Sequence, residues 1–169
     1  MKLQFQLPII NKQTIKYVVG IFPLIMLFTF QVNAQADFSG VWVQDNVKSD
    51  DFYKNYNITT TIKQTDREIS IVSDFFSKEG EKITTMSESF TLDGKETSVE
   101  EQGGINKKSA KWSADKKTLT ITNTRTVGTE VFGSHIAYSL SANGKVLTSV
   151  TTDANPLTGL KVTQVFNKK

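Results

Sequence analysis

Hydrophobic and polar side chains alternate along almost the whole chain after residue 37. Val, Ile, Thr and aromatic residues take every second position in runs of roughly five to ten residues, and turn-forming residues separate these runs. No run has the spacing of a long amphipathic helix. The pattern predicts strands at residues 38–44, 58–64, 68–76, 82–92, 97–101, 109–113, 118–127, 130–140, 145–152 and 160–167.

The connections between these runs are short and local. Asn143-Gly144 is a strong hairpin signal, because both central residues of such a turn favour positive φ, and only residues 45–57 form a long irregular stretch. The fold class is therefore all-β, an antiparallel up-and-down meander. An open sheet would leave an apolar face and two edges unprotected, which favours closure into a β-barrel of about eight to ten strands. A two-sheet sandwich is the alternative, and it needs longer crossing connections.

The first 34 residues have a different composition. A polar segment with three lysines precedes the uncharged run 17–30, and a small residue, Ala34, follows shortly after it. This order is typical of a secretory signal peptide. The alternative is an N-terminal membrane anchor, but the uncharged run is shorter than the roughly 20 residues that a spanning helix needs. We expect a cleaved signal peptide at 1–34, with Ala36 as a second possible exit, a barrel domain at 35–169, and a secreted or periplasmic protein.

Composition removes several functions. The chain has no Cys and one His, which excludes disulfides, thiolate zinc sites, a cysteine nucleophile and a multi-histidine metal site. The formal net charge of +3 comes entirely from Lys2, Lys12 and Lys16 in the leader, so the remaining chain is neutral. A neutral domain lacks the clustered basic residues that nucleic acid requires. We expect no cofactor, no metal, no nucleic-acid partner and no membrane span after the leader is removed; the oligomeric state is open.

Parity along the strands assigns side chains to the barrel interior, because neighbouring side chains point to opposite faces. Most inward positions are apolar, but some carry polar or charged groups. The residues expected to contact a ligand in the lumen are Glu88, Phe90, Asn123, Arg125, Phe132, Tyr138 and Gln164. A buried unpaired charge is costly, so Glu88 and Arg125 are expected to face inward and interact directly or through water. A bulge that shifts the register would instead send both charges to solvent.

Other candidates for chemistry are weaker. His135 falls on the outward face, where an exposed strand histidine is expected. Asp45, Asp50 and Asp51 lack the regular spacing of a calcium loop and are expected to be solvated loop acids. The aromatic residues of the same stretch either cover the barrel mouth or pack the stretch down; they are Phe52, Tyr53 and Tyr56. No nucleophile elbow is present, so we expect no enzyme activity.

The segment Ala36-Asp-Phe-Ser-Gly-Val-Trp-Val43 resembles the start of bacterial secreted lipocalin-like proteins, with Gly40-x-Trp42 similar to the G-x-W motif of the lipocalin first strand. The C-terminal Val162-Thr-Gln-Val-Phe-Asn-Lys-Lys169 also resembles that group. The resemblance implies a barrel whose Trp42 closes one end. Lipocalins usually place an arginine from near the C-terminus on this tryptophan. Here the only basic residues of the last strand are lysines, namely Lys161, Lys168 and Lys169.

Two functions are compatible with these observations. The first is binding of a small apolar or amphipathic molecule in the lumen of a secreted or periplasmic barrel. The alternative is a non-enzymatic structural or interaction module of the cell envelope whose interior is filled by side chains. An interior cavity lined by aromatic residues favours the first, whereas aromatic residues in contact with one another favour the second.

Overall fold

The computed structural model describes residues 34–169, so the expected signal peptide lies outside the described residues apart from Ala34. Within this range no helix has the length and hydropathy of a membrane-crossing segment. The strands are β1 (Gly40–Gln44), β2 (Asn57–Gln64), β3 (Glu68–Phe76), β4 (Lys82–Thr91), β5 (Thr97–Glu101), β6 (Gly104–Trp112), β7 (Thr118–Val127), β8 (Glu130–Leu140), β9 (Val146–Asp153) and β10 (Lys161–Lys168). A single 3-10 turn, η1 (Asp51–Tyr53), lies between β1 and β2.

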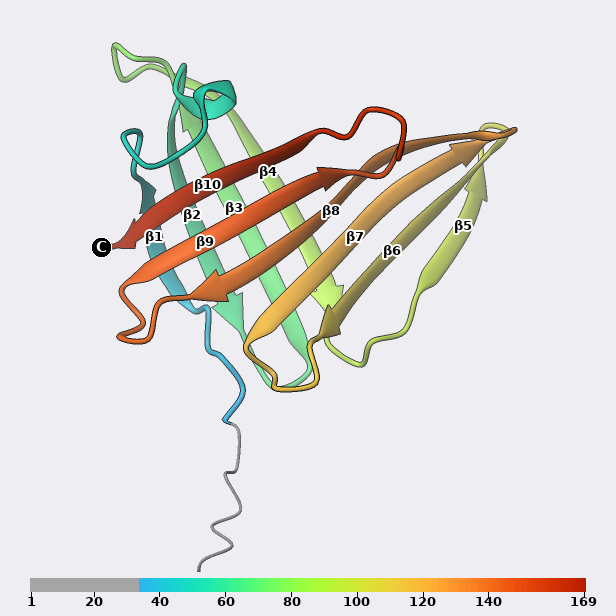
Figure 1. The fold of residues 1–169 in the computed structure, drawn as a ribbon, viewed down its shortest axis with the longest axis horizontal. Coiled ribbons are helices and arrows are strands. Elements are labelled where there is room, and N and C mark those ends of the chain that lie inside the picture. Colours follow the sequence, from blue (N-terminus) through green and yellow to red (C-terminus); the bar gives the residue numbers. More distant parts are fainter. Residues whose placement is uncertain (1–33) are drawn as a thin grey trace, which may run out of the picture. The chain divides into compact units, whose positions relative to one another are not determined.

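All ten strands belong to one antiparallel sheet with the order β4-β3-β2-β1-β10-β9-β8-β7-β6-β5. The pairing of β1 with β10 curls the meander round a common interior, as Figure 1 shows. The all-β meander with lipocalin-like architecture is therefore confirmed. The sheet is not strictly closed, because β4 and β5 are its two edges and do not pair with each other. We call the gap between β4 and β5 the seam.

Two strands begin two or more residues away from the expected position. β6 begins at Gly104 rather than at residue 109. The sequence pattern missed its first half, because that half is too polar to show an alternation of apolar side chains. β1 begins at Gly40 rather than at Phe38, since Gly40 has a φ of 140°, which an L side chain rarely adopts, and the chain bends there. A Cβ on Gly40 would also lie 2.9 Å from Cε of Lys168.

This bend directs the side chains of Phe38 and Trp42 into one end of the barrel, which we call the floor. Both side chains are fully buried, and the indole Nε1 of Trp42 donates a hydrogen bond of 2.8 Å to the carbonyl oxygen of Phe38. The Phe38 ring stacks on Trp112 of β6, with ring centroids 5.7 Å apart. The Nζ of Lys168 lies 5.1 Å from the Trp42 ring centroid. Lys168 therefore lies in a cation–π position over the tryptophan.

The segment before Phe38 crosses the same end of the barrel and is held at several points. Gln64 receives the Phe38 N–H on its Oε1 at 3.1 Å and donates from Nε2 to the Ala36 carbonyl at 2.9 Å. The Ala36 N–H reaches the carbonyl oxygen of Lys116 in the β6–β7 turn at 3.0 Å. These bonds join β2 and the β6–β7 turn across the floor and close this end.

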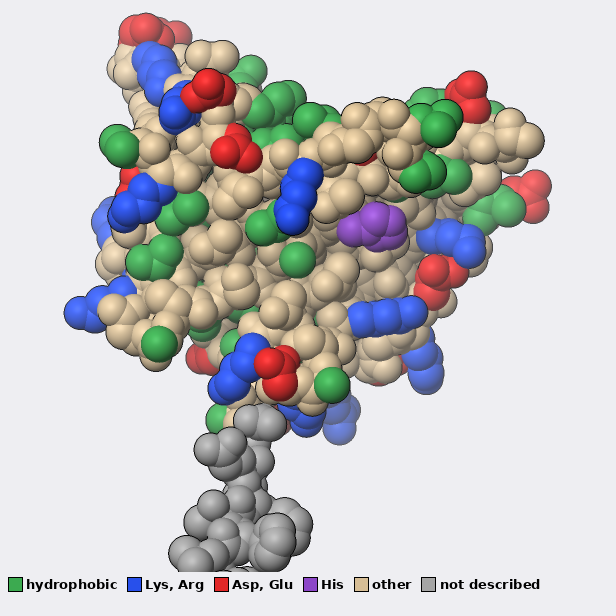
Figure 2. All heavy atoms as spheres, viewed as in Figure 1, with side chains coloured by type: hydrophobic (Ala, Val, Ile, Leu, Met, Phe, Trp, Pro, Cys, Tyr) green, Lys and Arg blue, Asp and Glu red, His purple; other side chains and the backbone are tan. Residues whose placement is uncertain are grey.

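The opposite end is different in character. Exposed large hydrophobic side chains gather in the connections and strand ends there, and Figure 2 shows several along the upper rim. The most exposed of them are Leu157, Val47 and Phe52, at 92%, 88% and 65%. The barrel thus has a sealed floor and an apolar mouth.

Replacing Trp42 should be among the most costly substitutions in this domain. Trp42→Ala leaves a cavity under the core and an unpaired Phe38 carbonyl, so the free energy of unfolding should fall by about 3–5 kcal/mol. Val43→Ala is the matched control, because Val43 is the next residue and faces outward with 41% exposure. Urea unfolding measures both. A loss of less than about 1 kcal/mol for Trp42→Ala would show that the floor does not depend on the indole.

Candidate functional site

The barrel interior contains a small cavity of about 40 Å³. Its walls come from five strands and combine apolar and polar side chains. They are Ile58 and Thr60 of β2, Ser73 and Phe75 of β3, Tyr138 of β8, Leu147 and Ser149 of β9, and Gln164 and Phe166 of β10. An apolar pocket with a few placed polar groups is the usual form of a small-molecule site.

The polar groups of the cavity wall are partly paired and partly free to bind. Thr60 and Ser73 share a hydrogen bond of 2.9 Å across neighbouring strands. Within residues 34–169, no hydrogen bond is found for the hydroxyl groups of Tyr138 or Ser149. The cavity therefore offers polar atoms to an occupant without the need to break a protein–protein hydrogen bond.

Gln164, one of the residues expected in the lumen, also supports the cover of the mouth. Its Nε2 donates to Oε1 of Gln44 at 3.2 Å. Gln44 in turn donates to Asn46 and, at 3.1 Å, to the carbonyl oxygen of Tyr53 in the β1–β2 loop, residues 45–56. Gln164 thus connects the cavity wall to the loop through Gln44.

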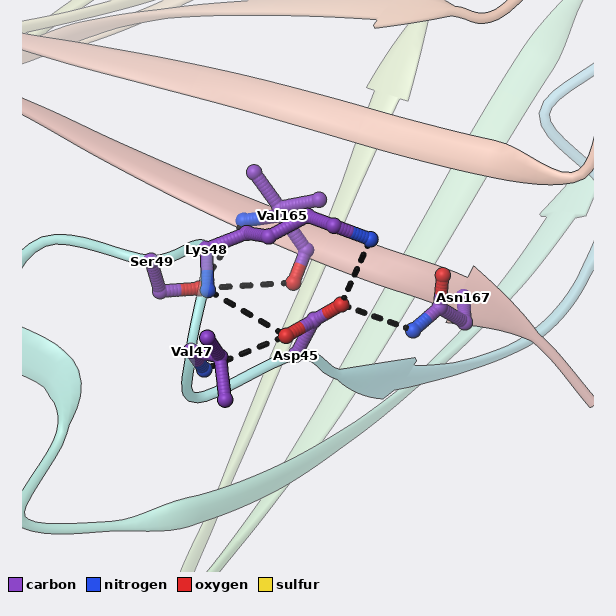
Figure 3. Close-up of polar contacts among 6 residues, drawn as sticks. All are labelled: Asp45, Val47, Lys48, Ser49, Val165 and Asn167. Atoms are coloured by element: carbon purple, nitrogen blue, oxygen red, sulfur yellow. Dashed lines mark hydrogen bonds and ion pairs between the residues drawn. The ribbon is translucent and has the colours of Figure 1, made fainter.

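The first half of the β1–β2 loop is fixed to β10. Asp45 is the centre of this attachment in Figure 3: its carboxylate accepts from the backbone of Val47 at 3.1 Å and from Asn167 at 3.2 Å, and it pairs with Lys48 at 3.0 Å. Lys48 and then Asn167 lower the pKa of Asp45 to about 2. The Thr163 N–H donates to Asp50 at 2.7 Å. Asp45 and Asp50 therefore hold the loop rather than standing free in solvent.

The aromatic residues of the loop divide between the two expected roles. Tyr53 packs against the buried core, and Tyr56 contacts Phe75 edge-on with ring centroids 6.2 Å apart. Phe52 also contacts Tyr53 but is 65% exposed at the mouth. The loop is packed down on the barrel by two aromatic rings and presents the third to solvent.

Glu88 is half-buried on the inward face of β4, as parity predicts, and lies opposite Ile71 of β3. Its Oε1 accepts a hydrogen bond of 2.8 Å from Nδ2 of Asn123 on β7, so two of the residues expected in the lumen meet across the interior. Arg125, which was expected to interact with Glu88 directly or through water, has other partners. No hydrogen bond or ion pair joins Glu88 to Arg125 in the part of the chain that the structure describes, so the direct contact is not formed.

Arg125 is occupied near the mouth. Its guanidinium donates to the carbonyl oxygens of Glu101 and Gln102 at 3.1 Å each and to Asn106 at 3.4 Å. Arg125 lies two residues beyond Asn123 on β7, toward the mouth. At that position its guanidinium reaches the backbone carbonyls of the β5–β6 turn. Phe132, paired with Arg125 in the β7–β8 ladder, is 50% exposed at the rim and does not line the cavity.

Phe90 is buried and belongs to the core, and it also borders the seam. A slot of about 150 Å³ lies there, lined by Ser89, Phe90, Thr91, Lys95, Thr97, Lys108 and Ser109. Met86 and Lys108 share the inward face of their strands, as their pairing with Ser73 and Asn123 shows, yet both are exposed. Inward-facing positions of β4 and β6 are therefore open to solvent at the seam.

Tyr138 connects the cavity with Glu88 electrostatically. Burial, first, and the negative charge of Glu88, second, raise the pKa of the Tyr138 phenol well above its ordinary value. The Tyr138 ring also lies 6.3 Å from that of Phe38, so it stands between the aromatic floor and the cavity. Trp112, on the other side of Phe38, has a buried Nε1 without a hydrogen-bond partner among the described residues.

His135 lies exposed on the outer face, next to Thr122, and takes no part in the lumen. Of the residues expected to contact a ligand, the cavity brings together Tyr138 and Gln164, with Glu88 and Asn123 beside them. Parity alone did not single out Ser73 or Ser149, because serine on an inward face gives no apolar signal. Ser149 lies two residues after Leu147 and therefore on the same face of β9, and that spacing is the signal that could have identified it.

The fold is shared with solved structures of very different sequence. Human cRBP IV superposes with a TM-score of 0.56 at 16% identity, covering 79% of this chain and 99% of its own. The REP1-NXSQ fatty acid transporter gives 0.52 at 14% identity, over 79% and 96% of the two chains. A secretary abundant heat soluble (SAHS) protein from Ramazzottius varieornatus gives 0.51 at 12%, over 78% and 94%. The barrel resembles lipocalin and fatty-acid-binding barrels. Neither a protein-family model nor a curated protein sequence matches the chain.

Double-mutant cycles should separate the real partner of Glu88 from the expected one. Combining Glu88→Ala with Asn123→Ala should give a coupling energy of about 1 kcal/mol in urea unfolding, as for a direct hydrogen bond. Combining Glu88→Ala with Arg125→Ala should give less than about 0.5 kcal/mol. The reverse order of the two coupling energies would contradict the assignment of Asn123 as the partner.

Alkaline unfolding should report the environment of Tyr138. The folded protein keeps the Tyr138 proton to a higher pH than the unfolded chain, whose phenol titrates near 10.0. Unfolding therefore releases a proton above that pH, and the free energy of unfolding should fall as the pH rises further. Tyr138→Phe should show a shallower fall in the same series of urea titrations. Equal slopes for the two proteins would show that the phenol is not held protonated by the fold.

Proposed function

We propose that the barrel binds one small apolar or amphipathic molecule in its lumen, as a carrier or receptor without catalytic activity. The observation that carries this proposal is the cavity itself, which lies in the interior of the barrel and combines Ile58, Leu147 and Phe166 with the free hydroxyls of Tyr138 and Ser149. Two features support it: the hydrophobic side chains exposed around the mouth, and the likeness of the fold to that of a protein named as a fatty acid transporter.

Binding requires the lumen to enlarge. The cavity of about 40 Å³ is well below the roughly 300–1,000 Å³ of typical ligand sites. The slot at the seam lies beside Phe90, and the exposed Met86 borders the same opening on the inward face of β4. Movement of these two side chains would extend the interior sideways without disturbing the floor.

We also infer that the chain is exported and that the leader is removed after Ala34. The basic, apolar and small-residue order of the leader supports export. Removal after Ala36 would delete a residue whose N–H bonds to Lys116 and whose carbonyl accepts from Gln64. Removal after Ala34 keeps both bonds, so the fold favours Gln35 as the first residue of the mature protein.

A second function, that of a structural or interaction module with a filled interior, is favoured by one observation. The ring of Phe38 packs between those of Trp112 and Tyr138 and contacts both, so aromatic side chains fill this part of the interior. Such a protein would bind nothing in its lumen and would act through its surface.

Native mass spectrometry of the protein purified from the cells that make it distinguishes the two functions. We expect a folded species carrying one additional small molecule, which organic solvent releases, and a polypeptide mass that begins at Gln35. A folded protein without bound mass, which also fails to bind the apolar fluorophore N-phenyl-1-naphthylamine, would support the filled module and overturn the proposal.

Two variants locate the bound molecule. Ser149→Val fills the cavity with a larger apolar side chain, and no hydrogen bond in the described chain is lost, so the protein should fold but lose the bound mass. Thr148→Val, at the neighbouring outward position of β9, is the control and should retain it. Loss in both variants, or retention in both, would show that the molecule is bound outside the cavity.

A further inference from the structure

The charge distribution beside the cavity bears on what kind of polar group the lumen accepts. Glu88 is the acidic residue that faces the interior from β4, between the buried Phe90 and the exposed Met86. Asn123 is its one hydrogen-bond partner in the part of the chain that the structure describes, and it engages Oε1 only. A carboxylate accepts several hydrogen bonds and donates none when ionised, so Glu88 retains capacity for further donors.

The cations on the same faces of β6 and β7 as Asn123 are not paired with Glu88. Arg125 is held by Asn106 and by the two carbonyls of the β5–β6 turn. Lys108 lies opposite Asn123 in the β6–β7 ladder and on the same face, but it is exposed at the seam and makes no ion pair with Glu88 within residues 34–169. The negative charge of Glu88 therefore remains uncompensated by a contacting cation at the side of the lumen.

The electrostatic effect of Glu88 reaches the cavity wall. On β3, Ile71 pairs with Glu88, and Ser73, two residues further along the same face, lines the cavity. Tyr138 lines it too, and its burial, followed by the negative charge of Glu88, raises the pKa of its phenol. An anionic group placed beside Tyr138 would meet the field of Glu88 in a partly desolvated interior, where repulsion between like charges is strong. A hydroxyl or ammonium group in the same place would donate to the free carboxylate oxygen, and it would also bond to the Tyr138 hydroxyl.

We propose that Glu88, positioned by Asn123, makes the lumen select amphipathic molecules whose polar end donates hydrogen bonds, an alcohol or an amine, over molecules that end in a carboxylate. This inference rests on the proposed function of the lumen as a ligand site. It identifies Glu88 as the residue that determines specificity and Tyr138 as the second contact of the polar end.

Competition against N-phenyl-1-naphthylamine tests the selection with three ligands of equal chain length. Dodecanol and dodecylamine should displace the fluorophore from the purified protein at concentrations roughly tenfold lower than dodecanoic acid requires at neutral pH. Glu88→Gln should reduce this difference to about twofold, chiefly because dodecanoic acid binds better and dodecylamine worse. The Gln side chain can still accept from Asn123, so the variant should remain folded, and its urea unfolding curve checks this.

Two further variants complete the experiment. Glu100→Gln removes an exposed charge from the outward face of β5 and should leave the order of the three ligands unchanged. Lys108→Gln tests whether a cation at the seam controls the choice instead. Equal displacement by dodecanoic acid and dodecanol, an unchanged preference in Glu88→Gln, or a preference lost only in Lys108→Gln would each overturn the inference and leave the proposed function intact. Failure of the fluorophore and of all three ligands to bind would instead refute the proposed function.

Discussion

The hydrogen bond from the Trp42 indole to the Phe38 carbonyl is the interaction on which the organisation of the barrel depends. It turns the chain inward just before β1, and the Phe38 ring then reaches Trp112 on β6, a strand that does not neighbour β1 in the sheet. One bond therefore connects opposite walls of the barrel through a stack of rings. The cavity lies next to these rings, since Tyr138 is part of its wall, and Gln164 connects that wall through Gln44 to the β1–β2 loop.

Most of the fold follows from local information. Alternation of Thr, Val, Ile and aromatic residues defines a strand wherever it is strong, and β3, β7 and β8 begin and end where the alternation does. It fails in the first half of β6, where Ile105 is followed by Asn106, Lys107 and Lys108. That half forms a strand because β7 and β5 pair with it on both sides, and pairing of this kind is a tertiary effect that the residues themselves do not encode.

The candidate site is less accessible to sequence reasoning. Parity correctly placed Glu88 and Asn123 on inward faces, but which inward side chains meet depends on how strongly the sheet curls, and no local pattern determines that curvature. Arg125 has the opposite charge to Glu88, yet it lies higher on β7 and finds the carbonyls of the β5–β6 turn within reach. Phe132 shows a second limit, since an inward direction near the end of a strand leads to solvent rather than to the core.

The seam changes the mechanics of the barrel. A fully closed ring of strands has a fixed circumference, and it can widen only if some backbone hydrogen bonds between strands break. This sheet is a split ring, because β4 and β5 are joined by a loop and not by a ladder. It can spread at the split by small changes of twist distributed over its strands, while every ladder from β4 round to β5 stays intact. Widening the barrel then costs only the side-chain contacts at the seam. The side chains that pack between β4 and β5 therefore determine how easily the interior can expand.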